Sequence, residues 1–244
     1  MGTSTSYKGL KGTPGWKELS TTVTSSCGSS KDNAAQRVFC KHASFVRENR
    51  RGNHGGGSGV GHAGTKAAKK LQSTFSTIRQ TGLSQSLASW GMLLNEHSQP
   101  KDVINFLLEH VCGSASSLDE VAAKQAEKML LEEICLDAES IQELQDKFQE
   151  TLQQYSDIQL LVRYFTYYLF THLSQRFYES LVRKKGKDNA GRLFQDIKDY
   201  IKECVIDISA QHDLQRVNWN STEGLDIEER IFNETLNAFA DYEN

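Results

Sequence analysis

The sequence predicts an all-α protein, in which a multi-helix, bundle-like body follows a flexible, basic N-terminal region rich in glycine and serine. Three observations support this prediction. Apolar residues recur three and four positions apart through most of the chain, no segment alternates apolar and polar residues over the length of a strand, and helix-capping residues flank the periodic stretches. With 244 residues, 38% of them apolar, the chain can bury one sizeable core.

Charge and glycine content divide the chain near residue 65. Nine Lys and Arg against three Asp and Glu give the first 65 residues a formal charge of +6, and the total of −3 leaves −9 for the rest. Twelve of the 18 glycines also lie before residue 66. We therefore expect residues 1–64 to be a mobile head with one short helix at about residues 32–49, and residues 65–244 to be a helical domain.

The short helix of the head is predicted from its apolar face. Val38 and Phe45 lie two helical turns apart, and Asp32 or Asn33 can cap the first turn. The preceding stretch, residues 20–30, is mostly Ser and Thr and has too little apolar surface to offset the entropy lost when a backbone is ordered. The composition therefore predicts no stable structure there.

The first four helices of the body are predicted from apolar faces that end at helix-stop residues. They cover about residues 65–81, 84–94, 100–112 and 118–136. Gly82 and Gly113 can end the first and the third, and Pro100 suits the first turn of a helix. Ser117 and Glu120 have the spacing of a capping box, in which each side chain binds the other residue's backbone N–H. The start of the fourth helix is therefore the most clearly marked.

The last four helices differ in how much of their surface is apolar. They cover about residues 141–152, 158–182, 189–209 and 226–240. The first has apolar residues on one side only, whereas the second is apolar nearly all round and is followed by Gly186. Arg163, His172 and Arg176 interrupt this second stretch too often for a membrane span. We expect it to be the central helix of the core.

A glycine-rich stretch before residue 67 nearly matches a phosphate-binding loop. Such loops carry Gly-Lys followed by Ser or Thr after a buried strand, but here the order is Gly64-Thr65-Lys66 and no apolar strand precedes it. We expect a linker that leads into a helix. The N–H groups at that helix start, together with the lysine, make Gly64, Thr65 and Lys66 a candidate anion-binding site.

No other pattern in the sequence indicates catalysis. The chain has no G-x-S-x-G, H-E-x-x-H or C-x-x-C sequence, so neither the common hydrolase motifs nor a zinc site is indicated. His172 lies alone in an aromatic helix and is expected to be a packing residue, because acid–base catalysis also needs a partner and a pocket. We expect no enzyme activity, no metal and no cofactor of the chain's own.

Targeting signals and cysteine usage favour a cytoplasmic protein. The N-terminal sequence lacks the apolar segment of a secretory signal, and no stretch is apolar over the length of a membrane span. The five cysteines are odd in number and widely spaced, which is untypical of a disulfide framework. We expect no membrane association. The basic head leaves nucleic-acid binding open, although it offers few aromatic side chains for base stacking.

The N-terminal residues combine a reactive group with a slender chain. Removal of Met1 would expose Gly2, whose unhindered α-amine has a lower reference pKa than a lysine side chain and is partly neutral near pH 7. The next residues are small or polar enough to enter another protein's active site: Thr3, Ser4, Thr5, Ser6 and Tyr7. Gly2 and Ser6 also fit the short myristoylation pattern, and a plain disordered terminus fits the composition as well.

Four segments occur in a characteristic order along the chain. They are the opening MGTSTSY at residues 1–7, the glycine run at 55–59 that leads into Ala63-Gly64-Thr65, and the helical segments 83–94 and 117–122. Together they resemble the QatB family, a component of bacterial Qat anti-phage defence operons. The resemblance extends through about residues 1–135 and is looser beyond.

The resemblance implies a non-catalytic subunit of a defence complex whose other components are an ATPase, a QueC-like enzyme and a TatD-like nuclease. QueC enzymes use ATP to activate the carboxylate of a deazaguanine, which ammonia then attacks. A QueC-like relative that accepts the Gly2 amine instead would attach a deazaguanine to the chain through an amide, with residues 3–7 in its active site. The alternative is a nucleic-acid-binding or scaffolding adaptor for the ATPase or the nuclease, which would use the basic head.

Overall fold

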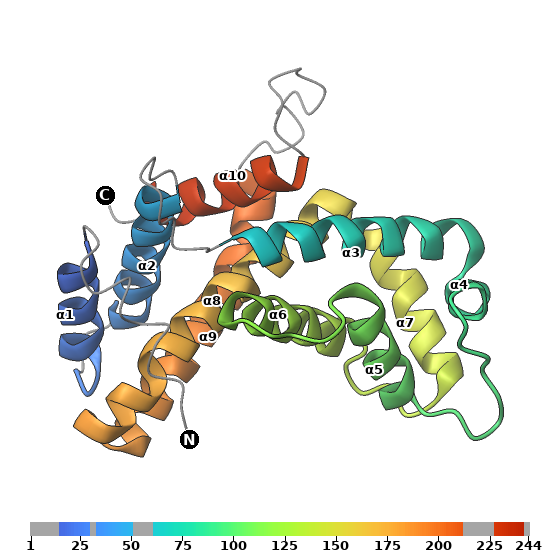
Figure 1. Ribbon diagram of the computed structural model, residues 1–244, viewed down its shortest axis with the longest axis horizontal. Helices are drawn as coiled ribbons and strands as arrows, with labels where there is room; N and C mark the ends of the chain where they lie inside the picture. Colours follow the sequence, from blue (N-terminus) through green and yellow to red (C-terminus); the bar gives the residue numbers. More distant parts are fainter. Residues whose placement is uncertain (1–14, 30–32, 51–60, 212–226, 242–244) are drawn as a thin grey trace.

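The computed structural model describes residues 15–29, 33–50, 61–211 and 227–241. Within these ranges the chain forms ten helices and no strand, which confirms the all-α prediction. The helices are α1 (Trp16–Ser26), α2 (Ala34–Arg50), α3 (His62–Thr81), α4 (Leu83–Ser89), α5 (Pro100–Val111), α6 (Leu118–Ile134), α7 (Ile141–Gln154), α8 (Asp157–Lys185), α9 (Lys187–Gln211) and α10 (Ile227–Asp241). Figure 1 shows α1 and α2 at one end of the molecule and α4, α5 and α7 at the other, with α8 running between the two ends.

Helix α8 is the centre of the core, as its apolar sequence predicts. It packs against α2, α3, α6, α9 and α10. Its first turn is capped by Ser156, whose hydroxyl accepts a hydrogen bond from the Gln159 N–H, and it ends at Gly186, which has a left-handed φ of 87°. Aromatic side chains fill the interface with α10, where the Phe165 ring stacks on the Phe232 ring with centroids 4.8 Å apart. The 29 residues of α8 therefore connect most of the other helices through one hydrophobic cluster.

The capping box predicted at the start of α6 is present. The Ser117 hydroxyl accepts a hydrogen bond from the Glu120 N–H at 3.2 Å, and the Glu120 carboxylate accepts one from the Ser117 N–H at 2.9 Å. Ser116 donates to the same carboxylate through its hydroxyl and its N–H, and these hydrogen bonds, with those from Ser117, lower the pKa of Glu120 to about 2. The start of α6 is thus fixed by local sequence.

Helix α4 is shorter than the sequence pattern predicts. It ends at Ser89 instead of continuing to about residue 94. Gly91 adopts a left-handed φ of 103°, the Met92 N–H donates to the Leu87 carbonyl at 2.9 Å, and the Gly91 N–H donates to the Ala88 carbonyl at 3.1 Å. These two bonds form the Schellman arrangement that a C-terminal glycine favours. The predicted end of this helix was wrong because it was placed by the apolar pattern, which continues to residue 94, and not by the helix-ending glycine at position 91.

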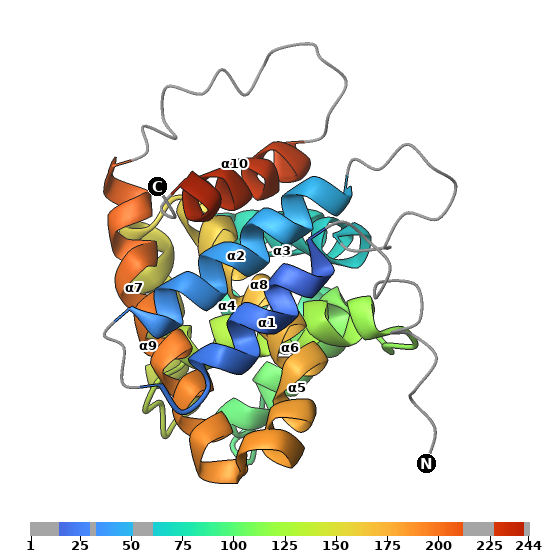
Figure 2. The same ribbon diagram turned by 90° about the vertical axis from the view of Figure 1, so that its left-hand side faces the viewer.

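Helix α1 occupies a stretch from which the composition predicts no stable structure. Leu19 and Val23 are fully buried, and the Trp16 ring stacks on the Phe177 ring of α8 with centroids 5.3 Å apart. Figure 2 shows α1 beside α2, and α2 packs in turn against α8, α9 and α10. The head predicted to be mobile therefore contains two helices that belong to the same hydrophobic cluster as the body. Its remaining segments, 1–14, 30–32 and 51–60, lie outside the described residues.

Candidate functional site

The predicted modification site lies outside the described residues. The residues concerned are Gly2, the predicted site of modification, and the predicted partner-binding tail of Thr3, Ser4, Thr5, Ser6 and Tyr7. The described chain begins at Gly15, the N-cap of α1. Helix α1 lies at one end of the molecule, where Lys41 of α2 holds it through a 2.6 Å ion pair with Glu18. The chain therefore enters the folded body at its periphery.

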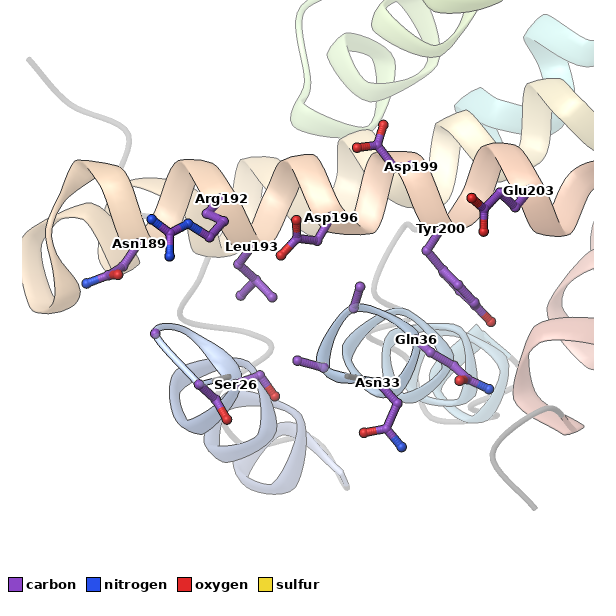
Figure 3. Close-up of a pocket in the computed structure, with 14 residues that line it drawn as sticks. Ser26, Asn33, Gln36, Asn189, Arg192, Leu193, Asp196, Asp199, Tyr200 and Glu203 are labelled. Atoms are coloured by element: carbon purple, nitrogen blue, oxygen red, sulfur yellow. The ribbon is translucent and has the colours of Figure 1, made fainter. Parts of the chain in front are cut away.

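A groove of about 610 Å³ opens between the end of α1, the start of α2 and the outer face of α9. Figure 3 shows Leu193 and Tyr200 of α9 directed toward α1 and α2, and Asp199 directed away from them. Asp196 and Glu203 also line the groove, so that three carboxylates and one guanidinium lie along α9. This charge favours contact with a cationic partner over contact with a phosphate. None of these residues was predicted from the sequence to line a site, although the three- and four-residue spacing of the acids indicates an acidic helix face.

The candidate anion-binding residues lie in the first turn of α3, and they do not form a common site. Gly64 is buried against Tyr168, whereas Lys66 is exposed. Two of the N–H groups at this helix start are already used, because Asp119 of α6 accepts hydrogen bonds from Ala63 at 2.8 Å and from Gly61 at 3.4 Å. An internal carboxylate thus occupies the position at the helix N-terminus that an external anion would take.

Asp119 and Tyr168 tie three helices together. The Tyr168 hydroxyl accepts a hydrogen bond from the Gly61 N–H at 2.8 Å and donates one to the Asp119 carboxylate. Burial, followed by the nearby Asp119 charge, raises the pKa of Tyr168, so the phenol stays protonated and keeps its role as a donor. The start of α3 is consequently fixed to both α6 and α8, and this cluster is a structural one.

Gly64 permits the close contact between α3 and α8. A Cβ at this position would lie 3.0–3.1 Å from three atoms of the Tyr168 ring, which is fully buried and held by its hydroxyl. We expect Gly64→Ala to lower the free energy of unfolding by about 1–2 kcal/mol, because overpacking exceeds the gain in helix propensity. Urea unfolding measures the effect.

The matched control for that prediction is Gly191 of α9. It also lies inside a helix, but nothing is within 4 Å of an added Cβ. Gly191→Ala is therefore expected to raise the free energy of unfolding by about 0.5–1 kcal/mol. Equal and stabilising effects at the two glycines would contradict the proposed contact with Tyr168.

Two histidines meet in the core between α2 and α8. His172 Nδ1 lies 3.4 Å from His42 Nε2, and an Arg176 guanidinium nitrogen lies 2.7 Å from His172 Nε2. Burial, followed by the Arg176 charge, lowers the pKa of His42 to about 3, and the same causes lower that of His172. Both rings are therefore neutral near pH 7 and are enclosed by protein, as expected of packing residues.

Glu127 of α6 is a carboxyl group buried beside the Cys112 thiol. Its side chain is fully buried and neither carboxylate oxygen accepts a hydrogen bond of ordinary geometry. Cys112 is a close neighbour, and Lys124 and Lys70 are the nearest cations. Burial outweighs their influence and raises the pKa of Glu127 to about 8, so the group is mostly protonated at neutral pH. The sequence does carry a signal for this burial, because Ala123, Leu130 and Leu131 lie four positions before and three and four positions after Glu127, on the same helix face.

The described part of the chain contains no group of three or more His, Cys, Asp and Glu side chains placed to share a metal ion. Among its helices, none combines the length and apolar character that crossing a bilayer requires. The five cysteines, all within the described ranges, form no disulfide. These findings concern only residues 15–29, 33–50, 61–211 and 227–241.

Comparison with protein families matches residues 59–239 to QatB, the Qat anti-phage system associated protein. The chain belongs to the QatB family. Its role is therefore in anti-phage defence, together with other Qat components. No curated protein and no solved structure matches the chain. The QatB match includes the Asp119–Tyr168 cluster, Glu127 and the α9 wall of the groove, whereas α1 and α2 precede it.

Proposed function

We propose that this QatB-family chain is a non-catalytic subunit of a Qat defence complex, and that Gly2 is the acceptor to which a QueC-like enzyme attaches a deazaguanine. The observation that supports the proposal most is the QatB match over residues 59–239, combined with the small, amine-bearing sequence at residues 2–7. In this proposal the QueC-like enzyme binds the tail, and the ATPase and the TatD-like nuclease join the complex. The chain itself contributes no catalytic residue, metal or cofactor.

The proposed reaction is an acyl transfer to the α-amine. ATP activates the deazaguanine carboxylate on the QueC-like enzyme, the neutral Gly2 nitrogen attacks the activated carbonyl carbon, and the activating group leaves with the C–O bond electrons. The nitrogen loses one proton, and an amide bond results. An α-amine suits this role better than a lysine side chain, because a larger fraction of it is neutral near pH 7.

The position of α1 is compatible with the proposal that Gly2 reaches the active site of a separate enzyme. Trp16 is anchored between the rings of Phe45 and Phe177, so the point from which the tail starts is fixed to the body. Fourteen residues precede Gly15, and a chain of that length spans at most about 50 Å when fully extended. A separate enzyme can therefore receive Gly2 in an enclosed active site while it contacts the α1 end of the body.

The test is mass spectrometry after co-expression with the QueC-like enzyme from the same operon. We expect the peptide covering residues 2–8 to gain the mass of the acylating deazaguanine, and we expect the gain to be lost when the enzyme is omitted. Gly2→Glu should also abolish it, because a large second residue prevents removal of Met1. Thr21→Ala, on the exposed side of α1, is the matched control and should be modified like the wild type.

An unmodified Gly2 in the presence of active enzyme would overturn the proposal. Strong, salt-sensitive DNA binding by that unmodified chain would instead favour the adaptor function predicted as the alternative. Two of the described cations of the head have internal partners, since Arg37 donates to Ser26 at 3.0 Å and Lys41 pairs with Glu18. These contacts make the adaptor the less favoured of the two functions.

A further inference from the structure

A second pocket lies at the end of the molecule away from α1. It has a volume of about 760 Å³ and opens where the end of α3 and the start of α4 face α7. This volume lies within the range of small-molecule sites, which commonly form between the helices of a bundle. We call it the amide pocket, after the glutamines Gln85, Gln145, Gln149 and Gln153 that line it.

The floor of the amide pocket is apolar. Ile78, Leu83, Phe148 and Leu152 line it and are each at least 95% buried. Gln85, Gln149 and Gln153 lie at its solvent-exposed rim. A flat ligand would therefore contact apolar side chains with its face and carboxamides with its edge.

Two cross-connections close the amide pocket at its ends. At one end Gln145 of α7 donates a hydrogen bond to the Ser84 hydroxyl of α4. At the other, the Arg79 guanidinium of α3, which also lines the pocket, donates to the Leu152 and Tyr155 carbonyls. Residues 145 and 152 lie about 10 Å apart along a helix axis, at 1.5 Å per residue. The closed ends fit a compact ligand better than a peptide that passes through.

The amide pocket offers no uncompensated charge. Arg79 is the one ionisable residue among those that line it, and its guanidinium pairs with Asp157 at 2.8 Å while it also binds the two carbonyls. Within the described residues, no hydrogen bond engages the carboxamides of Gln85, Gln149 or Gln153. A phosphate, a carboxylate or an amine would lose its hydration without gaining a counter-charge. The chemistry of the pocket thus favours an uncharged ligand with hydrogen-bonding groups.

We propose that the amide pocket binds an uncharged planar heterocycle. One edge of this ligand would present a hydrogen-bond donor beside an acceptor, as the edges of nucleobases do. A glutamine carboxamide carries both an N–H donor and a carbonyl acceptor, so it can pair with such an edge through two hydrogen bonds. The small exposed parts of Ile78, Leu83 and Leu152 supply apolar contact for the ring. This inference does not depend on the modification of Gly2.

The test titrates the full chain with adenine, cytosine, uracil and hypoxanthine, and with adenosine 5′-monophosphate, by isothermal calorimetry or ligand-observed NMR. We expect saturable binding of at least one free base, with adenosine monophosphate no tighter than adenine. Gln149→Leu should weaken that binding at least tenfold. Gln154→Leu makes the same change at an exposed neighbouring position that does not line the pocket and should leave binding unchanged.

Circular dichroism of both variants shows whether they remain folded. No binding of any base to the wild type, or equal losses in the two folded variants, would overturn the proposal. Tighter binding of the monophosphate than of adenine would overturn it as well, because it would show that the ligand is selected by its charge. If Gln149→Leu does not fold, Gln153→Leu provides the same comparison from the next turn of α7.

Discussion

Glu127→Gln is expected to raise the free energy of unfolding strongly at pH 8 and only slightly at pH 5. The glutamate is fully buried beside the Cys112 thiol, and burial raises its pKa from 4.5 to about 8. Between these two values the unfolded chain releases a proton that the folded protein retains, so this group lowers stability as the pH rises. The glutamine removes the titration and keeps nearly the same size.

The expected gain from Glu127→Gln grows by on the order of 3 kcal/mol between pH 5 and pH 8, at 1.36 kcal/mol per pKa unit. Urea unfolding of wild type and variant at both pH values measures it. Glu132→Gln makes the same change at an exposed position on the same helix and is the matched control. A difference between Glu127→Gln and wild type that is the same at both pH values would show that this carboxyl group ionises normally.

Asp119→Ala is expected to lower the free energy of unfolding by about 2–4 kcal/mol. The substitution removes the acceptor for the Ala63 and Gly61 N–H groups and for the buried Tyr168 hydroxyl. Loss of a helix cap costs about 1 kcal/mol, and a buried polar group without its partner adds about 1–3 kcal/mol. We expect α3 to lose its attachment to α6 and α8 before the other helices are affected.

Thermal and urea unfolding of Asp119→Ala measure that loss, and hydrogen exchange at residues 62–66 shows whether it is concentrated at the start of α3. Asp146→Ala is the control, because Asp146 is exposed and its carboxylate accepts a hydrogen bond from Gln142 on the same helix. A surface change of this kind usually costs less than about 0.5 kcal/mol. Equal losses in the two variants would mean that Asp119 does not hold α3 in place.

Local sequence was sufficient to predict most of the helical body. The capping box of Ser117 and Glu120, the proline at the start of α5 and the apolar run of α8 each act over a few residues or one helix, so they are visible without a structure. Helix α4 shows the limit of this approach. Gly91 is an equally local signal for the end of a helix, but the apolar spacing continues to Leu94 and predicted a longer helix.

Features that depend on distant contacts could not be predicted. Helix α1 is rich in Ser and Thr, which are poor helix formers, and it is stabilised by burial of Leu19 and Val23 and by contact of Trp16 with Phe177. The spacing of its three apolar residues was the one signal in the sequence. The burial of Glu127 and the hydrogen bonds from the start of α3 to Asp119 depend on tertiary packing, and neither residue was predicted from the sequence to have such a role.

The packing of α1 and α2 has a consequence for the design of truncated chains. The QatB match begins at residue 59, yet the Phe39 ring of α2 meets the Phe239 ring of α10 at 4.8 Å, and Trp16 covers Phe177. Cutting the protein back to the segment shared with its family would place these aromatic surfaces in water. The segment 59–239 is therefore not expected to fold stably by itself, because α1 and α2 cover part of its hydrophobic core.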